Sequence, residues 1–404
     1  MDLPFKKRLF YFFPVLFCFS LSFGSLFLSI IIISWVITSL FNFEKEKFAT
    51  AFKQKDFLLM LLFFVMTCIS AALSYNKMEA ITAIEIKMSF FIFPYLFFCF
   101  EWPLQLLKRC VISFVSGSFF ACILLLTRAA FYTFQGEEGR FFYTLFSVLI
   151  HPSYFAMYLI LALIFVILFY REWFKGQKTI IYSSYFFTLI FIVSIFLCSS
   201  KMGLIGLFIG VPITLMYKWK IKLNLRSITI LTMGMILTVC VAAKIFPGSF
   251  ERLSSLGALS NKTIDKTSSE STTVRILIWE QALNIIKNNF LLGTGVGDAN
   301  DKLYNAYKEN GLTGALEHHL NAHSQYFQSF IGMGAIGFVI LLFLTLGKMI
   351  NAFWKKNFLL FVFSLLIILN FSVESMLQTA AGVLFFAFFF CLFNVTDSKK
   401  LLSE

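Results

Sequence analysis

One polar stretch of this 404-residue chain, residues 268–337, lies between long apolar segments and holds side chains that could do chemistry. Its two most informative residues are Arg275, in RILIWEQAL, and His323, in NAHSQYF. A planar guanidinium can hold an anion through two hydrogen bonds, and an imidazole can accept a proton near neutral pH. Arg275 could therefore bind an anion and His323 could act as a general base. A solvated or headgroup-binding arginine and a capping histidine are the alternatives.

A lysine and a glutamate stand beside apolar runs of membrane length. Lys201 follows one such run in CSSKMGLIGL, and Glu374 lies alone between the last two runs, in NFSVESMLQTAAG. Charged groups at such depth are costly and usually have a partner or a function. Lys201 could be a second anion-binding cation, or a lysine that reaches the membrane surface from a helix end. Glu374 could orient Arg275 or His323, or be a turn residue in a short loop.

Further polar residues precede this stretch. Arg128 and Arg140 flank a segment that contains two glutamates, and HPSYFAMYL follows it, with His151, Pro152 and Tyr154. These side chains could line a path for a sugar or a lipid. They could equally form no more than the turn into the next helix.

Two adjacent histidines, His318 and His319, raise the question of a zinc site. His319 lies four residues before His323, so the two could share a helical face. The H-E-x-x-H pattern is absent, because Glu317 directly precedes His318, and no third ligand can be placed. We therefore expect no metal and no other cofactor.

The composition is that of a membrane protein. Hydrophobic residues make up 59% of the chain and charged residues 14%, against about 25% charged in soluble domains. Mean hydropathy is +0.83. All eight cysteines lie in or beside apolar runs without a C-x-x-C pattern, and we interpret them as buried apolar side chains rather than disulfides.

Apolar runs of about 20 residues can cross a bilayer as helices. The sequence predicts an all-α integral membrane protein with about twelve such helices, at residues 9–24, 25–42, 57–74, 84–101, 109–132, 147–170, 179–199, 202–217, 227–247, 323–347, 357–373 and 377–394. It divides into N-terminal transmembrane helices (1–247), a large extracytoplasmic loop (248–322) and C-terminal transmembrane helices (323–404), which form a single membrane domain.

The net charge of +13 could suggest nucleic-acid binding, but its distribution indicates membrane topology instead. Most basic residues fall in alternate segments between the apolar runs, beginning with Lys6, Lys7 and Arg8. This N-terminal cluster resembles a signal peptide, but no small-residue cleavage site follows, so we expect a retained first helix. The pattern predicts that both termini are cytoplasmic and that the 248–322 loop faces outward.

The outward loop is expected to contain a helix at residues 273–288. Arg275, Trp279, Ala282 and Ile286 recur at helical spacing on one face, and Ser271 or Thr272 could cap its start. Trp279 suits the membrane interface. The preceding stretch, SNKTIDKTSSESTT, is expected to be a surface linker.

Three segments in order resemble one known family. They are RILIWEQAL, with Arg275 and Trp279; LLGTGVG, with Gly293, Gly295 and Gly297; and NAHSQYFQSFIGMGAIGF, with His323. Over about 70 residues the chain is similar to the O-antigen ligase and polymerase family, bacterial membrane enzymes that move lipid-linked glycans. The LLGTGVG glycines lack a following lysine-serine pair and a preceding strand, so we expect tight turns rather than a phosphate loop. Gly332, Gly334 and Gly337 are expected to allow close helix packing.

The resemblance implies a GT-C-like membrane fold and a metal-independent, inverting glycosyltransferase. The implied donor is a glycan linked to undecaprenyl diphosphate, and the implied acceptor is a hydroxyl of lipid A-core or of another glycan. In this reading His323 activates the acceptor hydroxyl, Arg275 and Lys201 bind the diphosphate, and Glu374, His319, Trp279, Arg140 and Arg128 support them. Family members usually carry an arginine, in a Ser-Arg-Gly-like turn, where this chain has Lys201 followed by Met202. A lysine binds phosphate as a point charge, without the two-pronged geometry.

The acceptor distinguishes an O-antigen ligase, which we favour, from a polysaccharide polymerase or a protein O-glycosylating relative. The implied location is the bacterial inner membrane, among membrane lipids, with a periplasmic active face. A transporter of lipid-linked glycans without chemistry is the alternative from another class. Transporters tend to show two matching halves and charges at mid-membrane, whereas here the polar residues gather in one loop.

Overall fold

The computed structural model describes residues 4–24, 27–221 and 272–395, together with Thr229, Met233, Lys244, Lys266 and Thr267. Within these residues the secondary structure is entirely helical, as the apolar runs predict. The expected helix at 227–247 and most of the expected linker at 260–273 lie outside the described residues.

The first half of the chain supplies most of the long apolar helices. They are α1 (Phe5–Ser20), α2 (Leu28–Leu40), α4 (Lys55–Leu73), α5 (Lys77–Lys87), α6 (Ser89–Phe98), α7 (Leu104–Phe134), α9 (Pro152–Phe165), α11 (Lys178–Leu197) and α12 (Lys201–Lys218). Short elements join them: η1 (Leu21–Phe23), α3 (Lys45–Ala51), α8 (Tyr143–Phe146), η2 (Val166–Tyr170) and α10 (Arg171–Trp173).

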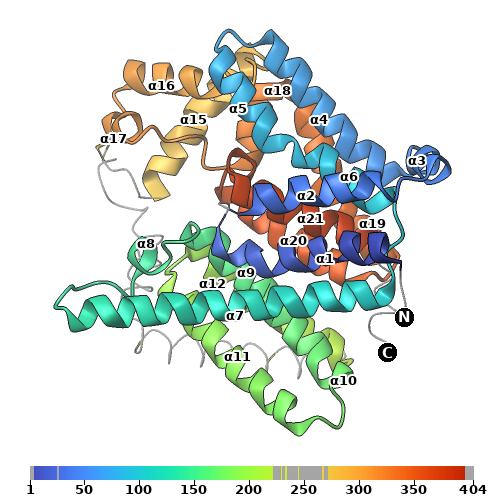
Figure 1. Ribbon diagram of the computed structural model, residues 1–404. Helices are drawn as coiled ribbons and strands as arrows, with labels where there is room; N and C mark the ends of the chain where they lie inside the picture. The colour runs from blue at the N-terminus through green and yellow to red at the C-terminus, as the bar shows by residue number, and fades with distance from the viewer. Residues whose placement is uncertain are drawn as a thin grey trace.

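The second half begins with a small helical layer and ends in three apolar segments. The layer consists of α15 (Thr272–Asn288), α16 (Ala299–Asn310) and α17 (Thr313–Glu317). The apolar segments are α18 (Gln325–Leu342) with η4 (Phe343–Gly347) and α19 (Lys348–Trp354), then α20 (Phe358–Val373), η5 (Met376–Gln378) and α21 (Ala380–Val395). In Figure 1, α15–α17 lie at one side of the bundle, and α3 and α19 lie at the opposite side.

Seven of the described helical segments are long and apolar enough to cross a membrane. α2, α20 and α21 are shorter apolar helices of 10–17 residues. Every expected span within the described residues corresponds to an apolar helix, whereas the total of twelve remains a prediction. The chain is therefore an all-helical integral membrane protein.

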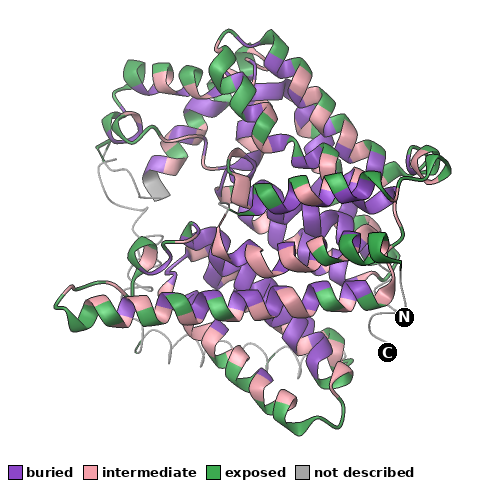
Figure 2. Cartoon of the chain, in the orientation of Figure 1, coloured by how far each residue is buried: buried purple, intermediate pink, exposed green. Residues whose placement is uncertain are grey.

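α9 lies in the centre of the bundle. All 14 of its residues are buried, and Figure 2 shows the buried residues concentrated in α9, α20 and α21. The Tyr158 ring stacks on Phe385 of α21 at 4.3 Å, and its hydroxyl donates to the Ala381 carbonyl at 2.7 Å. A helix that is apolar on every face needs protein or lipid on every side, and here protein provides it.

α15 confirms the helix predicted at 273–288. Its buried stripe contains Val274, Ile278, Ala282 and Ile286, which pack on Leu303 of α16. Arg275 and Trp279 lie beside this stripe and are only partly buried. The buried stripe therefore includes Ala282 and Ile286 of the expected face, whereas Arg275 and Trp279 lie at its edge and stay partly accessible.

The glycine-rich loop after α15 packs against a kink in α18. Gly293 and Gly295 have φ angles of 73° and 98°, and Gly334 (φ 65°) interrupts the helical backbone of α18. The Thr294 amide donates to the Ile331 carbonyl at 2.7 Å, and the Gly295 amide donates to the Gly332 carbonyl at 3.0 Å. The loop amides are used by protein acceptors, so the prediction of tight turns is confirmed.

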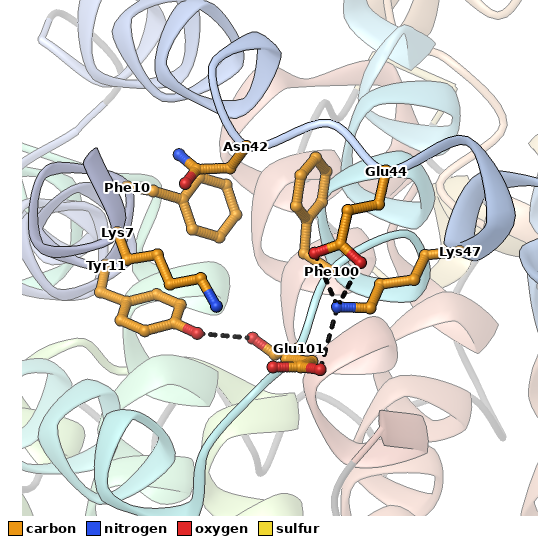
Figure 3. A pocket seen from close by; sticks show the side chains of 8 residues that line it. All are labelled: Lys7, Phe10, Tyr11, Asn42, Glu44, Lys47, Phe100 and Glu101. Atoms are coloured by element: carbon orange, nitrogen blue, oxygen red, sulfur yellow. Dashed lines mark hydrogen bonds and ion pairs between the residues drawn. The ribbon is translucent and has the colours of Figure 1, made fainter. Parts of the chain in front are cut away.

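The opposite end of the bundle is joined by a small ionic cluster. Lys47 of α3 lies 2.9 Å from Glu44 and 2.9 Å from Glu101, and Tyr11 of α1 donates to the Glu101 carbonyl at 3.3 Å (Figure 3). The hydrogen bonds that Lys47 donates to the two carboxylates raise its pKa. Exposed ion pairs contribute about 0–1 kcal/mol, so the cluster mainly fixes how three helix ends meet.

We expect Gly293→Ala to destabilise the protein by about 3 kcal/mol or more, because it adds a left-handed alanine and a backbone clash. A Cβ at Gly293 would lie 2.5 Å from the Gly334 nitrogen and 2.6 Å from the Ile331 oxygen. Gly311→Ala is the matched control, since Gly311 also has a positive φ, 67°, but its Cβ would meet nothing within 4 Å. Thermal unfolding of the purified protein in detergent measures both, and equal losses would contradict the packing argument.

Candidate functional site

A buried carboxylate, Glu374, forms the centre of the candidate site. It directly follows α20 and is 8% exposed. Its Oε1 lies 3.4 Å from Nη2 of Arg275, and its Oε2 lies 3.9 Å from Nδ1 of His323. The structure thus brings together three predicted residues from α15, from the segment before α18 and from the end of α20.

Two serines connect this carboxylate to the start of α12. Ser153 of α9 donates to Glu374 Oε1 at 3.2 Å, and Ser200 donates to the Ser153 hydroxyl at 3.3 Å. Ser200 also accepts from the Gly203 amide at 3.1 Å, which makes it the N-cap of α12. Lys201 is the first residue of α12, so its backbone starts next to this serine pair.

His151 adds a further polar group to the site. It caps α9, where its Nδ1 accepts from the Ser153 amide at 3.4 Å. Its ring lies between the rings of Tyr143, at 6.1 Å, and Tyr154, at 5.5 Å. The predicted segment that begins at His151 therefore contributes to the site through Ser153, a residue that sequence reasoning missed.

Glu374 is held in its charged form. Burial raises the pKa of its carboxyl group, but the neighbouring His323, Arg275 and His151 lower it more, to about 2. The folded-state pKa therefore lies below the usual 4.5. The resulting stabilisation is present above about pH 4.5 and is lost as the pH falls towards 2.

Three side-chain hydrogen bonds hold the backbone of the segment that carries His323. Trp279 Nε1 donates to the Ala322 carbonyl at 3.0 Å, and the Ala322 amide donates to Gln328 Oε1 at 3.0 Å. The His323 amide donates to Asn321 Oδ1 at 3.0 Å. His323 has φ 44°, an unfavourable value for a histidine that such contacts can maintain.

His319 does not share a helical face with His323, so that prediction was wrong. Residues 318–324 are not helical, and α18 begins only at Gln325, two residues after His323. His319 has φ 48° and is exposed, and its ring packs on Tyr304 of α16 at 5.2 Å. The Tyr304 hydroxyl donates to the His319 carbonyl at 3.1 Å, which directs this histidine to the α16 side.

Arg128 and Arg140 form a separate cluster at the end of α7. Their guanidinium groups lie on the Tyr132 ring, at 5.0 Å and 4.9 Å from its centroid. Arg140 pairs with Glu137, and Arg128 donates to the Leu145 carbonyl at 3.1 Å. These contacts stabilise the connection from α7 to α8 and do not involve Glu374.

The side chains around Glu374 have the properties that a transfer reaction to a hydroxyl needs. The side chains of Arg275 and His323 are 28% and 23% exposed, so a ligand can reach both. Nδ1 of His323 is buried, lies 3.9 Å from the carboxylate and has no hydrogen-bond partner within the described part of the chain. A proton on Nδ1 would be favoured by the carboxylate and would leave Nε2 free to accept another.

Comparison with known proteins relates part of the chain to one family. The family model described as O-Antigen ligase matches residues 186–342. This match supports the O-antigen ligase and polymerase family for that part of the chain. The resemblance inferred from its motifs is therefore confirmed, and the O-antigen ligase region contains Lys201, Arg275 and His323 but ends before Glu374. A search of curated proteins gives no match. The family is one of glycosyltransferase-like membrane enzymes.

We expect Glu374→Gln to lower the free energy of unfolding by about 3 kcal/mol at neutral pH, the equivalent of moving the pKa from 4.5 to about 2. The difference in the free energy of unfolding between Glu374→Gln and wild type should become smaller as the pH falls from about 4.5 towards 2, because Glu374 of the wild type then becomes protonated. Thermal unfolding across this pH range measures it. Glu85→Gln, which alters an exposed carboxylate on α5, is the control. A constant difference at all pH values would refute the charged state.

If the site performs a transfer reaction, we expect Trp279→Phe to slow that reaction about fivefold with little change in KM. The phenyl ring keeps the contact with Phe327 but cannot donate a hydrogen bond to the Ala322 carbonyl. The loss of this hydrogen bond, worth about 1 kcal/mol, leaves the position of His323 less well fixed. Trp354→Phe, at an exposed position on α19, is the matched control and should behave as wild type. Unchanged kcat in Trp279→Phe would show that this hydrogen bond does not position the histidine.

Proposed function

We propose that this protein transfers a glycan from undecaprenyl diphosphate to an acceptor hydroxyl, as an O-antigen ligase with lipid A-core as the acceptor. The observation that carries the proposal is the meeting of Arg275 and His323 at one buried carboxylate, in a chain that the O-antigen ligase family model matches in part. A cation for a diphosphate and a base for a hydroxyl are the two groups that this reaction needs.

In the proposed reaction, Arg275 and Lys201 hold the diphosphate of the donor. Nε2 of His323 takes the proton of the acceptor hydroxyl as its oxygen forms a bond to the anomeric carbon. The bond from that carbon to the diphosphate oxygen breaks, and the lipid diphosphate leaves with the electron pair. Attack opposite the leaving group inverts the anomeric configuration, and no metal takes part.

Glu374 has two roles in this proposal. It keeps Arg275 at the site, and it favours the His323 tautomer with the proton on Nδ1, because a carboxylate attracts that proton. It also stabilises the imidazolium that forms once Nε2 is protonated. The negative charge of Glu374 offsets the positive charge of Arg275. A second cation is therefore needed to attract the diphosphate, and we propose that Lys201 supplies it.

We propose that the protein lies in a bacterial inner membrane with both termini in the cytoplasm and the site on the periplasmic face. The distribution of basic residues supports this topology. The cluster of Lys47 with its two carboxylates and the α15–α17 layer lie on opposite sides of the bundle, which is consistent with it (Figure 1).

Two other functions compete with ligation. A polymerase of the same family would use the same site, with a growing glycan as the acceptor. A transporter without chemistry would not require a base, and the gathering of Arg275, His323 and Glu374 at one place favours an enzyme.

A complementation assay in a host that lacks its own ligase tests the proposal. Wild type should restore glycan-capped lipopolysaccharide, and Arg275→Ala and His323→Ala should each lower the product at least about a hundredfold at equal expression. Arg109→Ala and His318→Ala, at exposed positions away from Glu374, are the matched controls. Lengthening of unattached lipid-linked chains would instead indicate a polymerase. Full activity in both site variants would overturn the site and favour the transporter.

A further inference from the structure

A second buried charged residue lies apart from the candidate site. Lys87 is the last residue of α5 and is 1% exposed. Its Nζ is buried and has no hydrogen-bond partner among the described residues. A charged group inside a membrane protein is costly without a partner, and it usually marks a function.

The ammonium group faces a small cavity of about 10 Å³, where four segments of the chain meet. The cavity is lined by residues of the glycine-rich loop and α16 (Val296 and Ala299), of α18 (Gln328, Ser329, Gly332 and Met333) and of η5 (Gln378). No carboxylate is among these lining residues. Glu85, the nearest acidic residue in the sequence, is exposed on another face of α5.

The polar side chains around the cavity, Gln328, Ser329 and Gln378, are uncharged and carry both donors and acceptors. Ser329 Oγ accepts a hydrogen bond from Gln325 Nε2 at 2.9 Å, so its own hydrogen remains available. The side-chain oxygen of Gln328 accepts from the Ala322 amide at 3.0 Å. The side-chain nitrogen of Gln328 donates one hydrogen to Asn300 at 2.9 Å, and its second hydrogen remains available. A buried positive charge without a carboxylate in the same cavity, and with hydroxyl and amide donors beside it, is suited to an anion.

We propose that Lys87 and Ser329 bind a small monovalent anion of the size of chloride. The cavity is small, and this size excludes phosphate, sulfate and sugars. A water molecule could accept a hydrogen bond from Lys87 but could not neutralise its charge. This site is independent of glycan transfer, so its presence or absence leaves the proposed function untouched.

The anion would tie α5 to the parts of the chain that support the candidate site. Gln328 lines the cavity and also holds the backbone of Ala322, directly before His323. Gly332 lines it too, and its carbonyl accepts from Ser70 Oγ at 2.7 Å. Binding would therefore stabilise the contact between α4, α5 and the kinked helix α18.

The test is thermal unfolding of the full chain in detergent, with chloride or bromide replacing gluconate at constant ionic strength. Because a ligand that binds only the folded state stabilises it, chloride at about 100 times its Kd should raise Tm by about 3 °C. Gluconate is too large for the cavity and should not act. Lys87→Met keeps the length of the side chain without its charge and should abolish the chloride effect.

Two matched variants make the result specific. Lys77→Met removes an exposed lysine from the same helix and should retain the full chloride effect. Ser329→Ala should raise the half-maximal chloride concentration about tenfold, as expected for loss of one hydrogen bond to an ion. A wild type without chloride dependence, or Lys87→Met with the wild-type dependence, would overturn the proposal. If Lys87→Met does not fold, an anomalous bromide peak next to Lys87 in wild-type crystals supports the site, and its absence refutes it.

Discussion

The negative charge of Glu374 is the constraint on which the arrangement of the site depends. A carboxylate with 8% exposure is unfavourable in an apolar bundle unless cations and donors surround it. Arg275 and Ser153 meet it from positions 99 and 221 residues away in the sequence. No local segment can satisfy this charge, so the ends of α9, α15 and α20 must come together before it is stabilised.

The position of the α15–α17 layer next to the site follows from the same requirement. α15 carries Arg275 towards Glu374, and its apolar stripe fixes the helix on α16. Trp279, one turn further along α15, holds the backbone before His323. One short helix therefore sets the positions of both the cation and the histidine, and the kinked α18 holds the glycine-rich loop that leads away from it.

The sequence predicted the helices and the main site residues because both have local signals: apolar length, 3.6-residue periodicity and isolated charges. It missed Ser153 and Ser200 because serine at a helix start is common and usually only caps the helix. The expected pairing of His319 with His323 failed because both residues have positive φ angles, which spacing alone does not reveal. The contacts of Arg128 and Arg140 with the Tyr132 ring have no sequence signal, because they depend on how the chain turns after α7.

The complete burial of α9 has a consequence for how the chain can vary. A helix such as α11, whose window is only 28% buried, faces lipid along one side and can exchange one apolar residue for another there. The corresponding window of α9 is 94% buried, so every side chain along it must fit solid protein neighbours. The number of substitutions tolerated at each position should therefore vary with the helical repeat along α11 but be uniformly low along α9. In this respect α9 resembles a core helix of a water-soluble protein, although it lies in a membrane protein.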